Sequence, residues 1–459
     1  MDTKIDNNIA NNITQRQPNL PFFTIWNISF GFLGVQMAYG LQSANMSRVF
    51  QTLGADPSDL SLFWILPPLA GLIIQPIVGY FSDKTWFPKL GRRIPYLFIG
   101  AIVAVIVMIL FPHSGSFGFD VTQALIFGAL AVMFLDLSSN VAMQPFKMLV
   151  GDMVNEKQKT LAYSIQSFLS NLGNVLASVF PYLLAAIGVA NVAAKGVVPD
   201  SVIYSFYVGA ALLIVCCLYS AITVKELNPE EYARFHGFDL KDQFKKKSAN
   251  IITLLKKAPS AFWSIGLVQF FCWAAFLFLW TYSTSAIALN VWGTSDTTSN
   301  GFQDAGNWFG ILSAVQAVGA VLWSLLLPLI SKITSKKAAY CASLVLGAFG
   351  FGSIYFVHDQ YALIFSFVLI GIAWAAMMTF PFTILTNSLE GEHSEHMGSY
   401  LGLFNGTICL PQIVAAVGGK LLVPAMGGDS QTPTMFMVAA ILIVIGAFSV
   451  WVIREKDVA

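Results

Sequence analysis

Charged residues are scarce in this 459-residue chain, where Asp, Glu, Lys and Arg together make up only 11%. A soluble domain of this length carries about a quarter charged residues to cover its surface. The shortage therefore excludes a water-soluble enzyme or binding module. The net charge of +1 says nothing about partners, because the distribution of the charges along the chain carries that information. We expect no nucleic-acid partner.

Cysteine is also rare, with five residues in the chain. Its spacing fits neither a disulfide framework nor a zinc site, and we interpret all five as small apolar residues of the core: Cys216, Cys217, Cys272, Cys341 and Cys409. The chain also lacks a nucleotide-binding or nucleophile motif and a cleavable signal peptide. Glu392, His393, Glu395 and His396 are metal ligands by type, but we interpret them as a polar connection. We expect no enzyme activity, metal or cofactor.

Long apolar runs account for most of the chain, and hydrophobic residues reach 56%. A helix needs about 20 mostly apolar residues to span a bilayer, because its backbone must be hydrogen-bonded within the segment. The sequence therefore predicts an all-α membrane protein with twelve transmembrane helices. They cover residues 22–44, 60–82, 94–112, 121–144, 162–190, 201–224, 260–289, 306–331, 337–357, 361–386, 398–424 and 433–453.

A charged stretch divides six of these spans from six. We expect a tail at 1–21, a six-helix bundle at 22–224, a central linker at 225–259, a second bundle at 260–454 and a tail at 455–459. The bundles repeat each other: Pro145-Phe146 corresponds to Pro381-Phe382, and Val35-Gln36 to Val268-Gln269. A parallel repeat of this kind places the substrate site near the bilayer midplane, between the two halves.

Lys and Arg fall mostly on one side of the predicted membrane. Of the 25, only Arg48, Lys195 and Lys420 lie in connections after odd-numbered spans. Because cytoplasmic loops carry the excess of positive residues, we expect both termini and the central linker in the cytoplasm.

One acidic residue stands out among the 24 Asp and Glu, because Asp136 alone lies deep inside a span. Asp120 marks the external start of that span, and a rise of ~1.5 Å per residue places Asp136 roughly 24 Å inward. A carboxylate there costs a few kcal/mol unless it faces water or a partner. Burial favours its protonated form, which suits a proton carrier, and we predict Asp136 as the coupling site. A purely structural pairing with another helix is the alternative.

Neutral amides and tryptophans in the spans are candidates for sugar contacts, because amides offer both donors and acceptors to hydroxyl groups. Hydrogen bonds between helices, packing, and a snorkelling Lys147 are the competing interpretations; Trp280 and Trp374 are further stacking candidates. The predicted substrate-binding residues are Gln36, Gln42, Asn45, Asn140, Gln144, Lys147, Gln269, Trp273, Asn405 and Gln412.

The connection between spans 2 and 3 has the composition of a gate. Its glycines let helices approach closely, and its acid and arginines can exchange ion pairs as the halves move. We therefore predict a cytoplasmic gate at Gly79, Asp83, Gly91, Arg92 and Arg93.

These motifs carry a resemblance. Residues 79–93 resemble the signature loop of the major facilitator superfamily. Within it, the chain resembles the sucrose–proton symporters of plants and their animal and bacterial relatives. The shared residues are Gly34-Val35-Gln36, Leu41-Gln42, Gln51-Thr52-Leu53-Gly54, the run from Gln75 to Asp83, Leu135-Asp136-Leu137, Asn140, Pro145, Asp152, Pro381, Asn405-Gly406 and Pro411-Gln412.

The resemblance implies proton-driven uptake of an α-glucoside disaccharide of the maltose or sucrose type, with Asp136 handling both proton and sugar. Lys147 stands where plant members carry an arginine, and Pro57 where they carry a histidine. The short loops are typical of bacteria, so we expect a monomer in the bacterial cytoplasmic (inner) membrane. Its partners are then the lipid bilayer and a small sugar.

Three alternatives remain open at this point. A sodium-coupled symporter of the melibiose type would need several acids around one cation, and span 2 has none. A non-transporting sugar sensor would need an added signalling domain. A membrane enzyme would need a second catalytic group close to Asp136.

Overall fold

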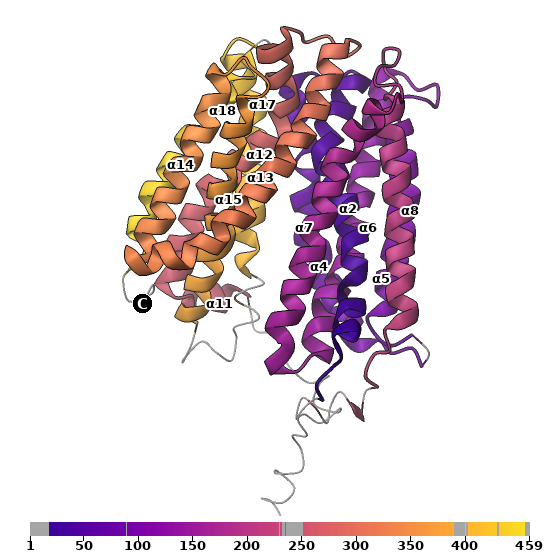
Figure 1. The fold of residues 1–459 in the computed structure, drawn as a ribbon, viewed down its shortest axis with the longest axis vertical. Helices are drawn as coiled ribbons and strands as arrows, with labels where there is room; N and C mark the ends of the chain where they lie inside the picture. The colour runs from indigo at the N-terminus through magenta and orange to yellow at the C-terminus, as the bar shows by residue number, and fades with distance from the viewer. Residues whose placement is uncertain are drawn as a thin grey trace, which may run out of the picture.

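The computed structural model describes residues 18–88, 90–228, 230–231, 235, 251–389, 400, 403–428 and 431–454. Long helices make up almost all of this part of the chain and stand roughly side by side (Figure 1). Those of the first half are α2 (Phe22–Leu53), α3 (Pro57–Phe63), α4 (Leu66–Lys84), α5 (Ile94–Leu110), α6 (Val121–Met153), α7 (Glu156–Ala186) and α8 (Asp200–Thr223).

The second half repeats the pattern. Its helices are α12 (Ser260–Trp292), α13 (Asn300–Ile333), α14 (Lys336–Phe356), α15 (Leu363–Ser388), α17 (Gly406–Ala425) and α18 (Thr434–Ser449). Short helical segments occur at η1 (Phe111–His113), α11 (Ile251–Lys257) and η4 (Val450–Val452). Each of the twelve predicted spans coincides with a helix over at least part of its length, which confirms the all-α fold class.

Eleven segments of the described chain are long and apolar enough to cross a membrane. α2 is not among them, although its 32 residues are ample for a span. Its polar side chains, including Gln36, Gln42, Asn45 and Arg48, lower its hydropathy. The first helix therefore falls short of the apolar character of the other eleven segments.

Several helices differ from the predicted spans in length; α6, for example, continues to Met153 and not to residue 144. Two further differences bear on the site. α2 continues to Leu53, so Arg48 lies inside a helix and not in a connection. The second span is broken at Trp64 and Ile65, between α3 and α4. Pro67 and Pro68 follow the break, and because proline has no N–H to donate, the helix ends and starts again there.

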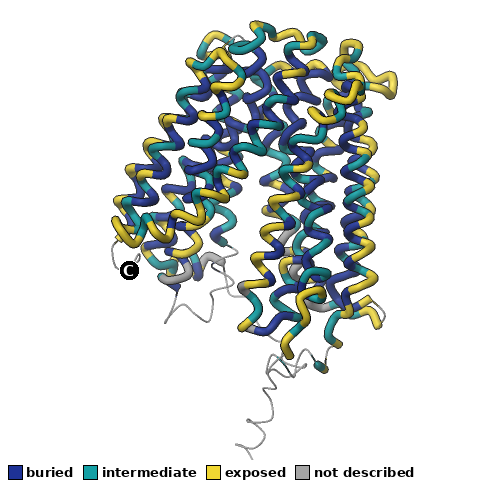
Figure 2. Tube along the Cα trace, in the orientation of Figure 1, coloured by how far each residue is buried: buried dark blue, intermediate teal, exposed yellow. Residues whose placement is uncertain are grey.

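The outer surface of the helices carries the apolar side chains that a soluble protein would bury, among them Leu130, Leu325 and Phe365. Buried residues line the interior, where the helices face one another (Figure 2). Exposed apolar surface of this extent fits a hydrocarbon environment, as expected of a multi-pass membrane protein.

The two sets of helices meet where α7 lies against α13, where α17 lies against α3 and α4, and where α12 lies against α2 and α3, with α13 also against α2. Gly310 of α13 makes the first contact possible, since a Cβ atom there would lie only 2.0 Å from the carbonyl oxygen of Ser178. The sets converge at one end and diverge at the other, where α2 begins and the chain ends (Figure 1). We call these the joined end and the open end.

Candidate functional site

Asp136 lies on α6, which starts in a capping box formed by Asp120 and Gln123. Its side chain is buried, with 1% exposure. Gln42 of α2 donates a hydrogen bond from Nε2 to Asp136 Oδ2 at 2.7 Å. A hydrogen bond to a carboxylate contributes more than one between neutral groups. The structure thus brings together the predicted coupling residue and one predicted sugar-binding amide.

Asn140 lies one turn after Asp136, and its Nδ2 donates to the Asp136 backbone carbonyl at 2.9 Å. Tyr39 of α2 lies close to both Asp136 and the Asn140 side chain. Sequence reasoning missed Tyr39. The available signal was its spacing, because Tyr39 precedes Gln42 by three residues and therefore shares its helical face.

Gln36 lies on the same helix but has different partners. Its Oε1 accepts from Asn174 Nδ2 of α7 at 3.2 Å, and its Nε2 contacts the Met143 sulfur at 3.8 Å. Asn174 was also missed, since nothing in the sequence indicates which face of α7 meets α2. Gln36 therefore connects three helices of the first half.

The corresponding part of the second half is aromatic. Gln269 is fully buried, and neither polar atom of its side chain has a hydrogen-bond partner in the described part of the chain. Trp273 follows one turn later, with ring centroids 5.6 Å from Trp374 and 6.3 Å from Trp280. Trp280 stacks on Trp64 of the first half at 6.0 Å, so this aromatic cluster crosses between the halves.

The remaining predicted sugar contacts are not gathered at Asp136. Asn45 and Gln412 donate to carbonyls of their own helices, those of Leu41 and Ile408. Asn405 contacts the Cys409 sulfur at 3.7 Å. These bonds lie within one helix, so they are neither substrate contacts nor the bonds between helices that the sequence suggested as the alternative.

Gln144 and Lys147 continue the polar stripe of α6 beyond Asp136. Gln144 is partly exposed and Lys147 is exposed. Lys147 lies about 16 Å from Asp136 along the helix, at ~1.5 Å per residue. The two charges are therefore too far apart along α6 to form a direct ion pair.

A buried arginine joins the two halves at the joined end. Arg48 is 1% exposed and donates to Gln303 Oε1 at 2.6 Å, Asn307 Oδ1 at 2.7 Å and Asn191 Oδ1 at 2.9 Å. Gln303 and Asn307 belong to α13, whereas Asn191 belongs to the connection between α7 and α8. We call Arg48, Asn191, Gln303 and Asn307 the Arg48 cluster.

Further contacts extend this junction. Asn191 also donates to Asp304 at 3.0 Å, which brings a negative charge near the guanidinium. Ser285 donates to Gln51 Oε1 at 2.8 Å, and Lys420 forms an ion pair with Asp59 on the surface. Gly306 leaves room for Arg48, since a Cβ atom there would lie 2.6 Å from Arg48 Cδ.

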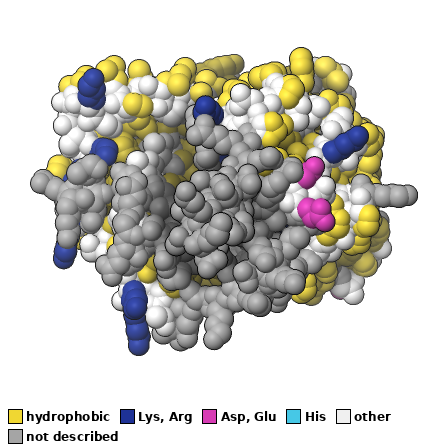
Figure 3. Space-filling view, turned by 90° about the horizontal axis from the view of Figure 1, so that it is seen from below, with side chains coloured by type: hydrophobic (Ala, Val, Ile, Leu, Met, Phe, Trp, Pro, Cys, Tyr) yellow, Lys and Arg dark blue, Asp and Glu magenta, His cyan; other side chains and the backbone are white. Residues whose placement is uncertain are grey.

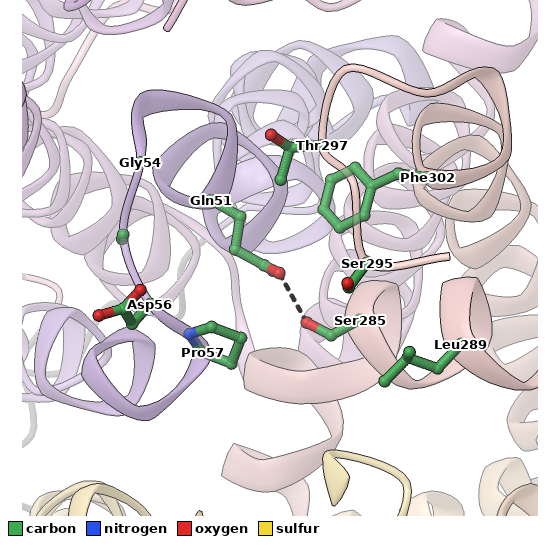
Figure 4. A pocket seen from close by; sticks show the side chains of 10 residues that line it. Gln51, Gly54, Asp56, Pro57, Ser285, Leu289, Ser295, Thr297 and Phe302 are labelled. Carbon is green, nitrogen blue, oxygen red and sulfur yellow. Dashed lines mark hydrogen bonds between the residues drawn. The ribbon is translucent and has the colours of Figure 1, made fainter. Parts of the chain in front are cut away.

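A cavity of about 230 Å³ lies at this junction and is lined by Gln51, Gly54, Ala55, Asp56, Pro57, Ser285, Leu289, Ser295, Thr297 and Phe302. Figure 4 shows the Gln51–Ser285 hydrogen bond crossing between the halves beside it. It does not include Asp136, whose surroundings are packed. We therefore take Asp136 and its neighbours, rather than this cavity, as the candidate site.

The predicted gate residues that the structure describes contact their own half. Arg92 and Arg93 lie 2.8 Å and 3.0 Å from Asp152 Oδ2 at the end of α6, and Arg93 Nη1 donates to Ser82 Oγ at 2.5 Å. Gly79 and Asp83 belong to the part of α4 whose side chains lie outside the described residues, and Glu392, His393, Glu395 and His396 lie outside them as well.

Glu226 completes this cluster and was missed by sequence reasoning. Its carboxylate accepts from the backbone N–H groups of Arg92, Arg93 and Ile94 at 2.8–3.1 Å. These groups open α5, where helical N–H donors have no partner within the helix. Burial raises the pKa of Glu226, while the N–H groups oppose that shift. Gly91, with φ +81°, leaves room for it, since a Cβ atom would lie 2.5 Å from Glu226 Cδ.

Comparison with known proteins adds independent information. The sequence profile of the Major Facilitator Superfamily matches residues 28–416. The sucrose transport protein SUC4 of Arabidopsis thaliana is 22% identical over 447 residues, covering 87% of this chain and 84% of that protein. The sucrose transport protein SUT5 of Oryza sativa subsp. indica is 23% identical over 490 residues, covering 93% and 87%.

Solved structures share the fold. A mutant of the nucleoside transporter NupG aligns with a TM-score of 0.69 and 14% identity, covering 94% of this chain and all (100%) of that one. A bacterial homologue of the human lysosomal transporter Spinster, in an inward-facing and occupied conformation, aligns with a TM-score of 0.63 and 14% identity, covering 95% and 98%. At this identity the likeness concerns architecture alone.

Proposed function

The chain belongs to the Major Facilitator Superfamily, and on that premise we propose that it imports an α-glucoside disaccharide of the maltose or sucrose type together with protons. It is a multi-pass membrane transporter, not an enzyme, and is distantly related to plant sucrose transport proteins. What we propose beyond family membership is the kind of sugar, the proton as the coupling ion and import as the direction of transport.

One observation carries the proposal: a buried carboxylate deep within a membrane helix, bonded to an amide of the facing helix. Asp136 and Gln42 supply a proton-binding group and a group that holds its charged form. Membrane-buried acids of this kind mark proton pathways. In the proposed cycle the sugar binds when Asp136 is protonated, and release of the proton accompanies release of the sugar.

Alternating access would use the two halves as rocking units. We propose residues 22–224 and 260–454 as these units, with 225–259 as their linker. Lys and Arg side chains surround the rim of the open end (Figure 3), which supports a cytoplasmic location for that end and for both termini. The joined end, with the Arg48 cluster, is then the closed external side.

The energetics are sufficient for accumulation. Each proton that crosses a potential of ~100 mV supplies about 2.3 kcal/mol, or roughly fifty-fold accumulation of a co-transported neutral sugar. The test is uptake of labelled maltose and sucrose into proteoliposomes under an inward proton gradient without sodium. Uphill uptake that a protonophore abolishes supports the proposal. Uptake that requires sodium, or a different substrate, contradicts it.

A further inference from the structure

An apolar groove of about 290 Å³ lies on the outer surface of the first half, between the broken second span and α6. One wall consists of Phe63 at the end of α3 and Leu66 at the start of α4. The other wall is a single stripe of α6, whose members recur every three or four residues. The stripe consists of Thr122, Leu125, Ile126, Ala129, Leu130 and Met133.

The groove begins at the joined end and has the depth of one membrane leaflet. Val121, the first residue of α6, lies next to Gly54, which follows the end of α2 at the joined end. From Thr122 to Met133 the stripe extends ~17 Å, at ~1.5 Å per residue. The hydrocarbon core of a bilayer is ~30 Å thick, so one leaflet contributes ~15 Å. The groove therefore spans the hydrocarbon of the leaflet at the joined end.

The groove is open because the second half holds α3 away from α6. α4 packs against α6, whereas α3 packs chiefly against α17. Ser61 of α3 lies against Gly419 of α17, where a Cβ atom would be only 3.0 Å from Ser61 Cβ. Trp64, at the helix break, stacks on Trp280 of α12 with ring centroids 6.0 Å apart. These contacts prevent α3 from closing onto the α6 stripe.

The composition of the groove suits a hydrocarbon chain. Of the eight residues that line it, only Thr122 is polar, and it lies at the end nearest the membrane surface. Ile126 and Leu130 are 56% and 49% exposed, so the groove opens onto the lipid-facing surface. An unfilled groove would forfeit the dispersion contacts of its walls. An apolar occupant is therefore required.

The width of the groove distinguishes between apolar occupants. Its volume of about 290 Å³, divided by a length of ~17 Å, gives a cross-section of about 17 Å², or a width of about 4 Å. Carbon atoms in contact lie about 3.5–4.0 Å apart, so a single chain fits. A helix of a partner protein is about 10–12 Å across and is too wide to enter.

We propose that the groove binds one acyl chain of a phospholipid from the leaflet at the joined end, and that this chain holds α3 against α17. A ligand that fits one arrangement better than another shifts the population towards it. The chain fits the groove while α3 is docked on the second half. The lipid therefore stabilises the closed joined end, whichever sugar or ion the protein carries.

The binding experiment uses the full chain purified in CHAPS, whose apolar part is a rigid ring system without a flexible tail. The probe is oleoyl lysophosphatidylcholine, which has a single acyl chain, with a photoreactive diazirine near the end of that chain. Mass spectrometry locates the labelled residues. Labelling of Ala129 and Met133 should exceed that of Val215 about fivefold, although Val215 of α8 is 58% exposed on the same half.

Ser61→Cys reports the position of α3. Ser61 is fully buried where α3 meets α17, so a cysteine there reacts with a maleimide only when α3 moves away. Labelling is corrected for the five native cysteines by using the chain without this substitution. Unmodified oleoyl lysophosphatidylcholine should slow the labelling about fivefold. Glycerophosphocholine, which is the headgroup without a chain, should have no effect.

Ala129→Trp fills the groove with an indole ring. The variant should lose the excess photolabelling, and its Ser61→Cys labelling should be slow with or without the lysolipid, because the ring replaces the acyl chain. Val215→Trp is the matched control, since it adds the same ring to the lipid-facing surface outside the groove. It should respond to the lysolipid as the wild type does.

Three results would overturn the inference. Photolabelling that is even over the exposed apolar residues would mean that lipid covers this face without a binding site. Labelling confined to the groove, with no change at Ser61→Cys, would show that the chain does not support α3. A wild-type dimer in mass photometry that Ala129→Trp dissociates would assign the groove to a second copy of the protein. The wild-type measurements decide the first two cases even if Ala129→Trp does not fold.

Discussion

Gln42 and Asp136 are 94 residues apart in the chain, yet Nε2 of the amide lies 2.7 Å from Oδ2 of the acid in the interior of the helix bundle. The contact ties α2 to α6 within the first half of the chain. A charged acid within a membrane helix costs a few kcal/mol of free energy unless it faces water or has a partner that offsets its charge, and such acids are usually functional. The pair therefore forms the centre of the proposed mechanism.

Gln42→Leu should slow the coupled cycle. The amide stabilises the charged carboxylate by about 1.5–3 kcal/mol, the usual contribution of a hydrogen bond to a charged group. Without it, Asp136 gives up its proton less readily, and uphill uptake should fall about ten- to hundred-fold. Exchange of sugar at equal concentrations, which needs no net proton release, should fall much less. Equal losses in both assays would show that Gln42 contributes only to sugar binding or folding.

Gln303→Leu should open the joined end. The substitution removes the acceptor 2.6 Å from Arg48 Nε, and a buried charge that loses a partner destabilises its surroundings by about 3–5 kcal/mol. The closed arrangement should therefore be less populated. Ala55→Cys, a buried position in the cavity of Figure 4, provides the reporter, because its labelling by a membrane-impermeant maleimide should become at least tenfold faster.

Lys420→Met is the control for this experiment. The Lys420–Asp59 ion pair is about 40% exposed, and surface pairs contribute about 0–1 kcal/mol. Labelling at Ala55→Cys should change less than about fivefold in that background. An equal effect of both variants would mean that the Arg48 cluster has no special part in holding this end closed.

Glu226→Ala should destabilise the open end of the first half. The carboxylate accepts from three backbone N–H groups at the start of α5, and each buried donor left without a partner costs about 1–3 kcal/mol. Glu226→Gln keeps an oxygen acceptor and should retain most of the stability. Thermal unfolding in detergent compares the two, and identical melting temperatures would contradict the role given to Glu226.

The pH dependence of this group has a definite sign. Burial raises the pKa of Glu226 in the folded state despite the opposing N–H groups. Its protonation therefore adds stability that is fully present below the unfolded-state pKa and is lost as pH rises through the folded-state pKa. The melting temperature of the wild type, relative to Glu226→Gln, should fall as pH rises through that window. A difference that grows in the opposite direction would contradict the assignment.

The fold could be predicted because membrane-spanning helices are recognisable in a sequence by their length and hydropathy. Asp136 was recognisable for the same reason, as an acid within an apolar run. Arg48 was assigned to a connection, because the polar residues of α2 placed the predicted end of the span at residue 44, although the helix continues to Leu53. Pro67 and Pro68 could have indicated the helix break at Trp64, but a prediction from hydropathy alone does not take prolines into account.

Contacts between helices could not be predicted from the sequence. Asp136 has Gln42 as its partner because α2 lies against α6. A single sequence does not reveal which faces of two helices meet. The same holds for Glu226, which lies 132–134 residues from the N–H groups that it binds. Local bonds such as Asn45 to Leu41 were foreseeable in kind, since amides in helices often bond the preceding turn.

The most direct test of proton coupling through Asp136 compares the wild type with Asp136→Asn in proteoliposomes loaded with and without sugar. Asparagine keeps the size and polarity of the side chain but cannot exchange a proton. Under an inward proton gradient, the wild type should accumulate labelled maltose or sucrose uphill. Asp136→Asn should fail to accumulate it, yet still exchange labelled for unlabelled sugar. Full accumulation by Asp136→Asn, at the wild-type rate and abolished by a protonophore, would contradict the account.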